Sequence, residues 1–200
     1  MLELASRPGH GGKRRGAGRK PKGDRAGVSH RPRAGLAAAF PVHVTMRARA
    51  HVWNLRSRRA FGVVGESLAA IRERAGFRVV HFSVQGNHLH CLAEADTPDA
   101  LARGIQALSI RLAKGLNRMM SRRGAVWADR YHARVLRTPA EVRNALAYVL
   151  GNFASHARRR GERVAEAFVD PFSSAGEGRA LVREPTTWLL SRGWARVRRS

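Results

Sequence analysis

The chain has little cysteine, few acidic residues and no long apolar run. Its single cysteine, Cys91, excludes an internal disulfide and a zinc site built from several cysteines. The apolar stretch GLAAAF, from Gly35 to Phe40, is far shorter than a membrane span, and it lies too far from Met1 for a signal-peptide core. These absences predict a soluble cytoplasmic protein that does not enter a membrane.

The shortage of acidic residues gives the chain an extreme charge. Against 14 Asp and Glu residues stand 38 Lys and Arg residues, so the formal net charge of the 200 residues is +24. Such a chain repels itself, and a polyanionic partner is the simplest physical reason to retain the charge. Nucleic acid is the first candidate, which predicts association with the nucleoid. A basic ribosome-associated protein is the plainer alternative.

Composition divides the chain into three parts. Residues 1–35 are rich in glycine and basic residues and nearly free of apolar ones, which predicts a disordered basic arm. Within it, RGAGRKPKG partly resembles an AT-hook, a peptide that binds the DNA minor groove. The favoured role of this arm is non-specific contact with DNA phosphates through basic residues that include Arg14, Arg15, Arg19 and Lys20. Residues 36–160 form the predicted folded domain, and residues 161–200 form a C-terminal basic extension.

From Phe40 onward, strand patterns alternate with helix patterns. FPVHVTMRA places every second residue on an apolar face, as a half-buried strand does. We expect a strand there, a helix over Gly62–Gly76, strands over Arg78–Val84 and His88–Glu94, a helix from Thr97 to about Met120, a strand over Trp127–Leu136 and a helix from Thr138. This β-α-β-β-α-β order, followed by a helix, predicts an α+β fold with a ferredoxin-like antiparallel sheet. Proteins of many functions share this fold, so the function must be inferred from the residues of the site.

Two histidines stand one residue apart in the apolar run FSVQGNHLHCLAEA. If this run is a strand, His88 and His90 point to one face, while Leu89 and Cys91 point to the other. Two neighbouring imidazoles are costly to bury unless something uses their lone pairs. A metal ion is the obvious user, but two ligands do not complete a site.

The last predicted helix carries a polar stripe beside its apolar one. Tyr148, Asn152 and His156 follow one another at intervals of four residues and therefore share a helix face. Taken alone, this stripe is explained by a half-buried tyrosine at the boundary of the core and a solvated histidine at the helix end. Tyr131 is the only other tyrosine, and it lies on a predicted strand.

Together these segments resemble a known family. The His88-Leu89-His90 triplet resembles the His-hydrophobic-His motif of the HUH single-strand nucleases. YVLGN, from Tyr148 to Asn152, resembles the tyrosine helix of the single-tyrosine (Y1) transposases of the IS200-like family. The blocks WADRYHARVLRTPAEVRNALAYVLGNFASH, DPFSSAG and TWLLSRGW resemble stretches of the REP-associated tyrosine transposase branch. The similarity covers most of the chain and places the catalytic domain at residues 36–160.

The resemblance implies an enzyme that cleaves and rejoins single-stranded DNA at hairpin or palindromic elements. His88 and His90 would bind a divalent metal ion, Mg²⁺ or Mn²⁺, and Asn152 would complete the protein ligands. Tyr148 would be the nucleophile, giving a 5′-phosphotyrosine and a free 3′-hydroxyl. Arg130 and Arg134, on one face of the predicted strand, would hold the backbone of the hairpin. The enzyme would act as a monomer or a homodimer.

Two other functions remain open at this point. The scaffold could serve as a catalytically silent DNA-binding protein, such as a repressor of its own element. A ferredoxin-like sheet can also bind RNA, but RNA binding requires paired aromatic residues on the central strands. Phe82 is a lone candidate for this role. The presence of all four expected site residues favours the enzyme.

Overall fold

The structure is a computed structural model that describes residues 36–197. The predicted basic arm, with Arg14, Arg15, Arg19 and Lys20, lies outside these residues. Among the described residues, no helix combines the length and the apolar character that crossing a membrane requires.

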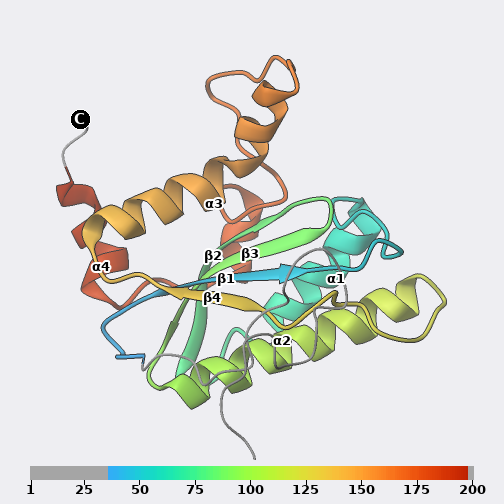
Figure 1. Cartoon of the computed structure of the whole chain (residues 1–200), viewed down its shortest axis with the longest axis horizontal. Helices are drawn as coiled ribbons and strands as arrows, with labels where there is room; N and C mark the ends of the chain where they lie inside the picture. The colour runs from blue at the N-terminus through green and yellow to red at the C-terminus, as the bar shows by residue number, and fades with distance from the viewer. Residues whose placement is uncertain (1–35, 198–200) are drawn as a thin grey trace, which may run out of the picture.

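A four-stranded antiparallel sheet forms the centre of the molecule (Figure 1). Its strands are β1 (Val42–Arg47), β2 (Phe77–Val84), β3 (His88–Ala95) and β4 (His132–Val135). They lie in the order β2-β3-β1-β4, so the two central strands are β1 and β3. With α1 (Arg58–Ala69) between β1 and β2 and α2 (Pro98–Met119) between β3 and β4, the predicted α+β, β-α-β-β-α-β fold is confirmed.

Two predicted elements differ from those observed. The stretch over Trp127–Leu136 is not one continuous strand, because the Asp129 carboxylate accepts a hydrogen bond from the Arg130 backbone N–H at 2.7 Å. Such a local turn competes with the strand ladder. Trp127 therefore makes only an isolated bridge to Ala48, and β4 is short. Helix α1 begins at Arg58 instead of Gly62, because Ser57 caps it by accepting the Ala60 N–H, and it ends at Ala69 instead of Gly76.

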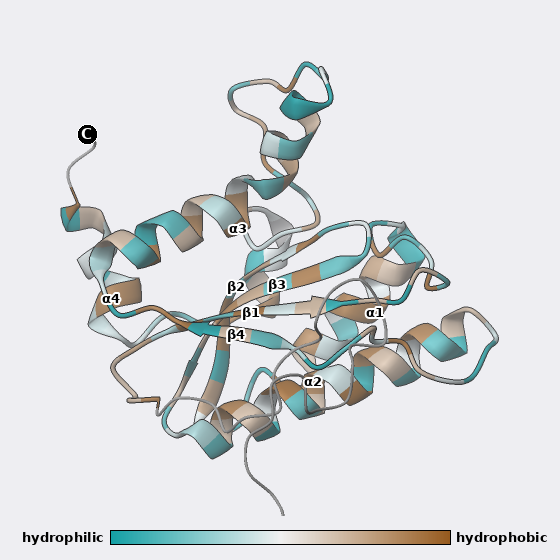
Figure 2. Cartoon of the chain, viewed as in Figure 1, coloured by the Kyte–Doolittle hydropathy of each residue, from teal (hydrophilic) through white to brown (hydrophobic). Residues whose placement is uncertain are grey.

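The two faces of the sheet carry different helices. Helices α1 and α2 cover one face and enclose the larger apolar core, which includes Leu89 and Cys91 from β3. Burial raises the pKa of the Cys91 thiol to about 12, so Cys91 is an inert small apolar group. Helix α3 (Pro139–Arg159) packs on the opposite face against Val80 and Leu92. Figure 2 shows apolar and polar residues alternating around α2 and α3, as helices that cover a sheet require.

Beyond α3 the chain returns to the sheet. A 3-10 helix, η1 (Glu177–Leu181), the short helix α4 (Trp188–Ser191) and a second 3-10 helix, η2 (Gly193–Arg196), follow in order. The buried Glu94 carboxylate of β3 accepts hydrogen bonds from the backbone amides and hydroxyls of Thr186 and Thr187, at 2.8–2.9 Å. A buried carboxylate needs this many donors to offset its lost hydration. These bonds hold the start of α4 on the sheet.

A buried ion pair joins three distant parts of the chain. Both oxygens of Asp170 accept hydrogen bonds from the Arg56 guanidinium, at 2.8 and 2.9 Å, and Arg56 also donates to the Val84 carbonyl at 2.8 Å. The guanidinium lies 3.8 Å from the ring centre of Phe153 on α3 and 4.4 Å from that of Phe172. Arg56 therefore connects the end of β2, the segment after α3 and α3 itself.

Removing one member of this pair should destabilise the fold strongly. We expect Asp170→Ala to lower the free energy of unfolding by about 3–5 kcal/mol, because it leaves the Arg56 charge buried without its partner. Urea denaturation followed by circular dichroism measures the change. The control is Glu162→Ala, which removes the exposed partner of Arg160 and should leave the unfolding midpoint unchanged. Equal midpoints for the two variants would contradict a structural role for the Asp170 pair.

Candidate active site

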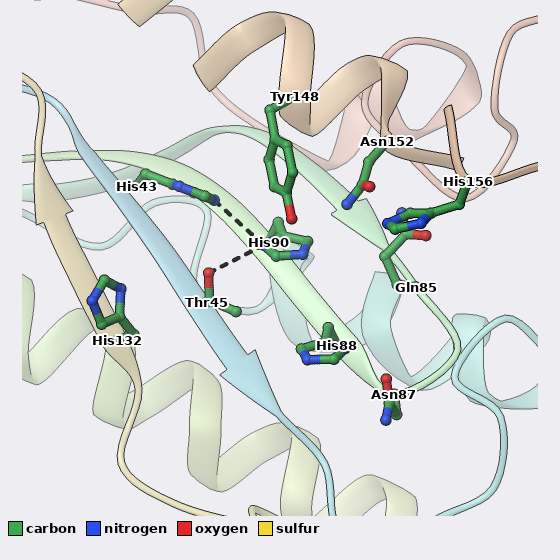
Figure 3. Close-up of a pocket in the computed structure, with 10 residues that line it drawn as sticks. All are labelled: His43, Thr45, Gln85, Asn87, His88, His90, His132, Tyr148, Asn152 and His156. Carbon is green, nitrogen blue, oxygen red and sulfur yellow. Dashed lines mark hydrogen bonds between the residues drawn. The ribbon is translucent and has the colours of Figure 1, made fainter. Parts of the chain in front are cut away.

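The histidine pair lies on the face of the sheet that α3 covers. As the alternation of β3 predicts, His88 and His90 share this face, and their rings stack with centroids 5.9 Å apart and planes 5° apart. His90 is buried and His88 is half-buried. Both imidazoles border a cavity between the sheet and α3 (Figure 3).

Two residues of β1 orient His90. Thr45 lies opposite His90 in the β1–β3 pairing, and its hydroxyl oxygen is 3.1 Å from His90 Nδ1. Nε2 of His43 is 3.3 Å from the same nitrogen. When Nδ1 holds the proton, it donates to one of these neighbours and leaves the Nε2 lone pair for another use. The sequence shows His43 and Thr45 only as the polar face of a strand.

The imidazoles at the centre of the site are neutral at physiological pH. Burial, with a smaller contribution from the neighbouring His43, lowers the pKa of His90 to about 3. Burial, followed by the effects of His132 and Arg134, lowers the pKa of His43 to about 4. Burial also lowers the pKa of His88. Because a metal ion binds only the unprotonated ring, these shifts keep the lone pairs available.

Helix α3 presents Tyr148, Asn152 and His156 to the same cavity. The Tyr148 ring meets His90 edge to face with centroids 5.3 Å apart, and it meets His43 at 5.8 Å. Its side chain remains 48% exposed, whereas Asn152 is only 4% exposed. Figure 3 shows Tyr148 and Asn152 reaching from α3 toward His90. The Tyr148 ring is thus open to solvent, while the carboxamide beside it is buried.

The cavity has a volume of about 660 Å³. That is within the usual range of ligand-binding cavities. It is lined by His43, Thr45, Gln85, Asn87, His88, His90, His132, Tyr148, Asn152 and His156. All four residues that the resemblance implies are therefore brought together. Gln85, Asn87 and His132 join them through the β2–β3 turn and β4, contributions that no local pattern indicates.

The other residues singled out from the sequence lie elsewhere. Arg130 precedes β4 and borders a different cavity, of about 420 Å³, together with Tyr131. Arg134 lies on β4, and its guanidinium forms an ion pair with Glu141 at 3.0 Å. That pairing offsets part of the positive charge that we expected Arg134 to offer to DNA.

A comparison with protein families decides the identity. Residues 40–152, more than half of the chain, match the family described as "Transposase IS200 like". The chain belongs to the IS200-like transposase family. This confirms the resemblance seen in the sequence, and membership implies a DNA-cleaving enzyme. No curated protein matches the chain.

Two solved structures are similar to the chain. One is a REP-associated tyrosine transposase bound to a REP hairpin. It is 15% identical in sequence, with a TM-score of 0.56 over 76% of this chain and 86% of that one. Another is a candidate transposase from Deinococcus radiodurans, 13% identical, with a TM-score of 0.41 over 68% of this chain and 98% of that one. At these identities, the first similarity supports the fold alone and the second supports no conclusion.

The side chains of the transposase fit a divalent metal ion, which members of the family generally use. Among residues 36–197, no group of three His, Cys, Asp or Glu side chains could hold such an ion. The third donor that the resemblance implies is the carboxamide of Asn152, whose buried Nδ2 has no hydrogen-bond partner. Rotating the amide aims Oδ1 into the same space. Two neutral imidazoles and one amide oxygen form a suitable ligand set for Mn²⁺.

The neutral state of the central imidazoles is directly testable in the metal-free transposase. We expect the ring signals of His43 and His90 in NMR spectra to stay constant from about pH 8 to about pH 5.5, because burial opposes protonation. In the unfolded chain both rings titrate near pH 6.5. Between about pH 6.5 and about pH 4, the unfolded state therefore binds more protons than the folded state does. The free energy of unfolding should accordingly fall as the pH falls through this range.

One variant serves as the control for this titration. His43→Asn should make the fall in stability shallower, because one buried titrating ring is gone. A titration midpoint near pH 6.5 for His43 or His90 in the folded protein would show that these rings are not held neutral.

Proposed function

We propose that this transposase cleaves and rejoins single-stranded DNA, with Tyr148 as the nucleophile and His88, His90 and Asn152 as ligands of a divalent metal ion. One observation carries the proposal. The half-exposed Tyr148 ring rests against the buried His90 ring inside one cavity of one chain, with centroids 5.3 Å apart. Nucleophile and candidate metal ligands are thus close enough to act on the same phosphate.

The chemistry follows from the groups in the cavity. A bound divalent ion would neutralise charge on the nonbridging phosphate oxygens. Tyr148 Oη loses its proton and attacks phosphorus, the bond from phosphorus to O3′ breaks, and the departing O3′ takes up a proton. The products are a 5′-phosphotyrosine and a free 3′-hydroxyl. Attack by a 3′-hydroxyl on the phosphotyrosine reverses the step and releases the phenol, so rejoining needs no ATP.

The chain's own residues supply positioning. His43 and Thr45 hold the His90 ring through Nδ1, and the rings of His43 and His90 pack against the Tyr148 ring. Packing on two sides restricts the side-chain torsions of Tyr148, while its exposed part meets the DNA. Because fixed orientation lowers the entropy cost of attack, these contacts favour an in-line approach to phosphorus.

The substrate is proposed to be single-stranded DNA beside a hairpin. An in-line attack requires the scissile phosphate to be turned into the cavity, and a flexible single strand permits this where a stacked duplex resists it. The net charge of +24 favours a nucleic-acid partner. The similar transposase bound to a REP hairpin supports a hairpin as the structural element that is recognised.

Removing the Tyr148 hydroxyl should abolish the chemistry while DNA binding persists. With Tyr148→Phe, a labelled single-stranded hairpin incubated with Mn²⁺ should give no cleavage and no covalent adduct on a denaturing gel. Tyr131→Phe is the control, because Tyr131 borders a different cavity, and it should form the adduct as the wild type does. Formation of an adduct by Tyr148→Phe would show that another residue is the nucleophile.

The same assay tests strandedness. Annealing the complementary strand should suppress cleavage by the wild type. Equal cleavage of the duplex would contradict the proposed substrate, and tight binding of duplex DNA without any adduct would instead identify a repressor.

Metal binding can be measured without DNA. Isothermal titration with Mn²⁺ should show binding to the wild type, and His90→Ala should abolish it. Asn152→Ala should have a milder effect, because water can partly replace an amide ligand. Thr45→Val should weaken binding about ten- to a hundredfold, because His90 loses one of the two groups that orient its ring. The control is His81→Ala, which removes a histidine outside the cavity; equal loss of Mn²⁺ binding in this variant would contradict the site.

A further inference from the structure

A second cavity adjoins the catalytic one on the other side of Tyr148. It has a volume of about 370 Å³ and is lined by His43, Arg134, Leu136, Glu141, Asn144, Ala145 and Tyr148. The two cavities share His43 and Tyr148. From Tyr148, the catalytic cavity extends toward the C-terminal end of α3 and the second cavity toward its N-terminal end. Tyr148 therefore stands between two parts of one groove.

The second cavity combines an apolar floor with a polar wall. Leu136 and Ala145 are buried in the core beneath α3 and form the floor. Asn144 is exposed one helical turn before Tyr148, on the same stripe as Asn152. Its carboxamide offers both a hydrogen-bond donor and an acceptor. A flat ligand with apolar faces and a polar edge fits such a lining.

The charges of this cavity disfavour a phosphate. The Glu141 carboxylate accepts hydrogen bonds from the backbone N–H groups of Arg137 and Thr138 and from the Arg134 guanidinium. These bonds, that from Arg137 foremost, lower the pKa of Glu141, so the group is charged at neutral pH. The pair of Arg134 and Glu141 carries no net charge, and the carboxylate repels anions. A neutral ligand is therefore favoured.

We propose that the second cavity holds the base of one of the two nucleotides that flank the scissile phosphate, and that Asn144 reads the edge of this base. The inference rests on the proposed single-strand cleavage at Tyr148. When a phosphate lies at Tyr148, the base of an adjoining nucleotide must lie beside it, where this cavity opens. Unpaired bases are commonly bound between flat side chains and read by amide groups. The rings of His43 and Tyr148 and the Arg134 guanidinium supply the flat surfaces.

The proposal assigns a second source of specificity to the enzyme. A hairpin fixes where the protein binds, but the base beside Tyr148 fixes which phosphate enters the cavity. We expect the wild type to prefer one base, by roughly tenfold in cleavage rate, at one of the two flanking positions. At the other position the four bases should be equivalent.

The experiment uses single-stranded hairpin DNA with each of the four bases at either flanking position. Asn144→Ala and Asn144→Leu should reduce the preference to about twofold or less and leave Mn²⁺ affinity unchanged. The matched control is Gln106→Ala, which removes an exposed carboxamide from α2 and should keep the preference of the wild type. A wild type without base preference, or an Asn144 variant that retains it, overturns the proposal.

A second measurement separates this inference from the proposed function. The fluorescent base 2-aminopurine, placed at either flanking position, reports entry into the cavity without any cleavage. In the Tyr148→Phe background, we expect the fluorescence to change at one position and Asn144→Ala to remove the change. An Asn144-dependent change with a wild type that never cleaves would refute the proposed function and uphold the subsite. Cleavage without any change in fluorescence would uphold the proposed function and refute the subsite.

Discussion

The pairing of β1 with β3 at the centre of the sheet is the constraint on which the active site depends. This register sets Thr45 opposite His90 and brings its hydroxyl within 3.1 Å of the imidazole. A slip of one residue would turn the histidine pair into the apolar core and bring Leu89 and Cys91 to the groove. The buried residues on the far face, packed under α1 and α2, make that slip costly. The packing of the apolar core thereby determines which side chains of β3 lie on the opposite face.

Helix α3 meets two opposed requirements. The candidate metal ligand, Asn152, must be buried to keep its orientation, whereas the proposed nucleophile, Tyr148, must be accessible from solvent. A stripe of buried apolar residues anchors the helix, and the four-residue spacing then places Tyr148 at the rim and Asn152 inside. The Arg56 guanidinium on the Phe153 ring adds a fixed point next to Asn152. The position of the proposed nucleophile is thus set by groups that have no proposed part in the reaction.

Local patterns in the sequence predict the fold order and the candidate residues that lie on single elements. The alternation of β3 predicts that His88 and His90 share a face, and helical spacing predicts that Tyr148 and Asn152 do. His43 and Thr45 escape prediction because their contact with His90 depends on strand register across more than 40 residues. The Arg56–Asp170 pair spans 114 residues, and no periodicity connects such positions. The error in β4 came from a side chain, Asp129, that bonds locally and interrupts an otherwise strand-like pattern.

The segment after α3 also covers the outer edge of β2. Ser173 bridges to Ser83, the Val84 N–H donates to the Phe172 carbonyl at 2.9 Å, and the Ser174 N–H donates to the Phe82 carbonyl at 3.0 Å. Exposed strand edges invite pairing with other chains, and these bonds satisfy that edge within the molecule. Within residues 36–197, the other edge of the sheet is formed by β4, which is only four residues long. A protein with an open, apolar-floored groove is thereby protected against joining its sheet, along β2, to that of a neighbour.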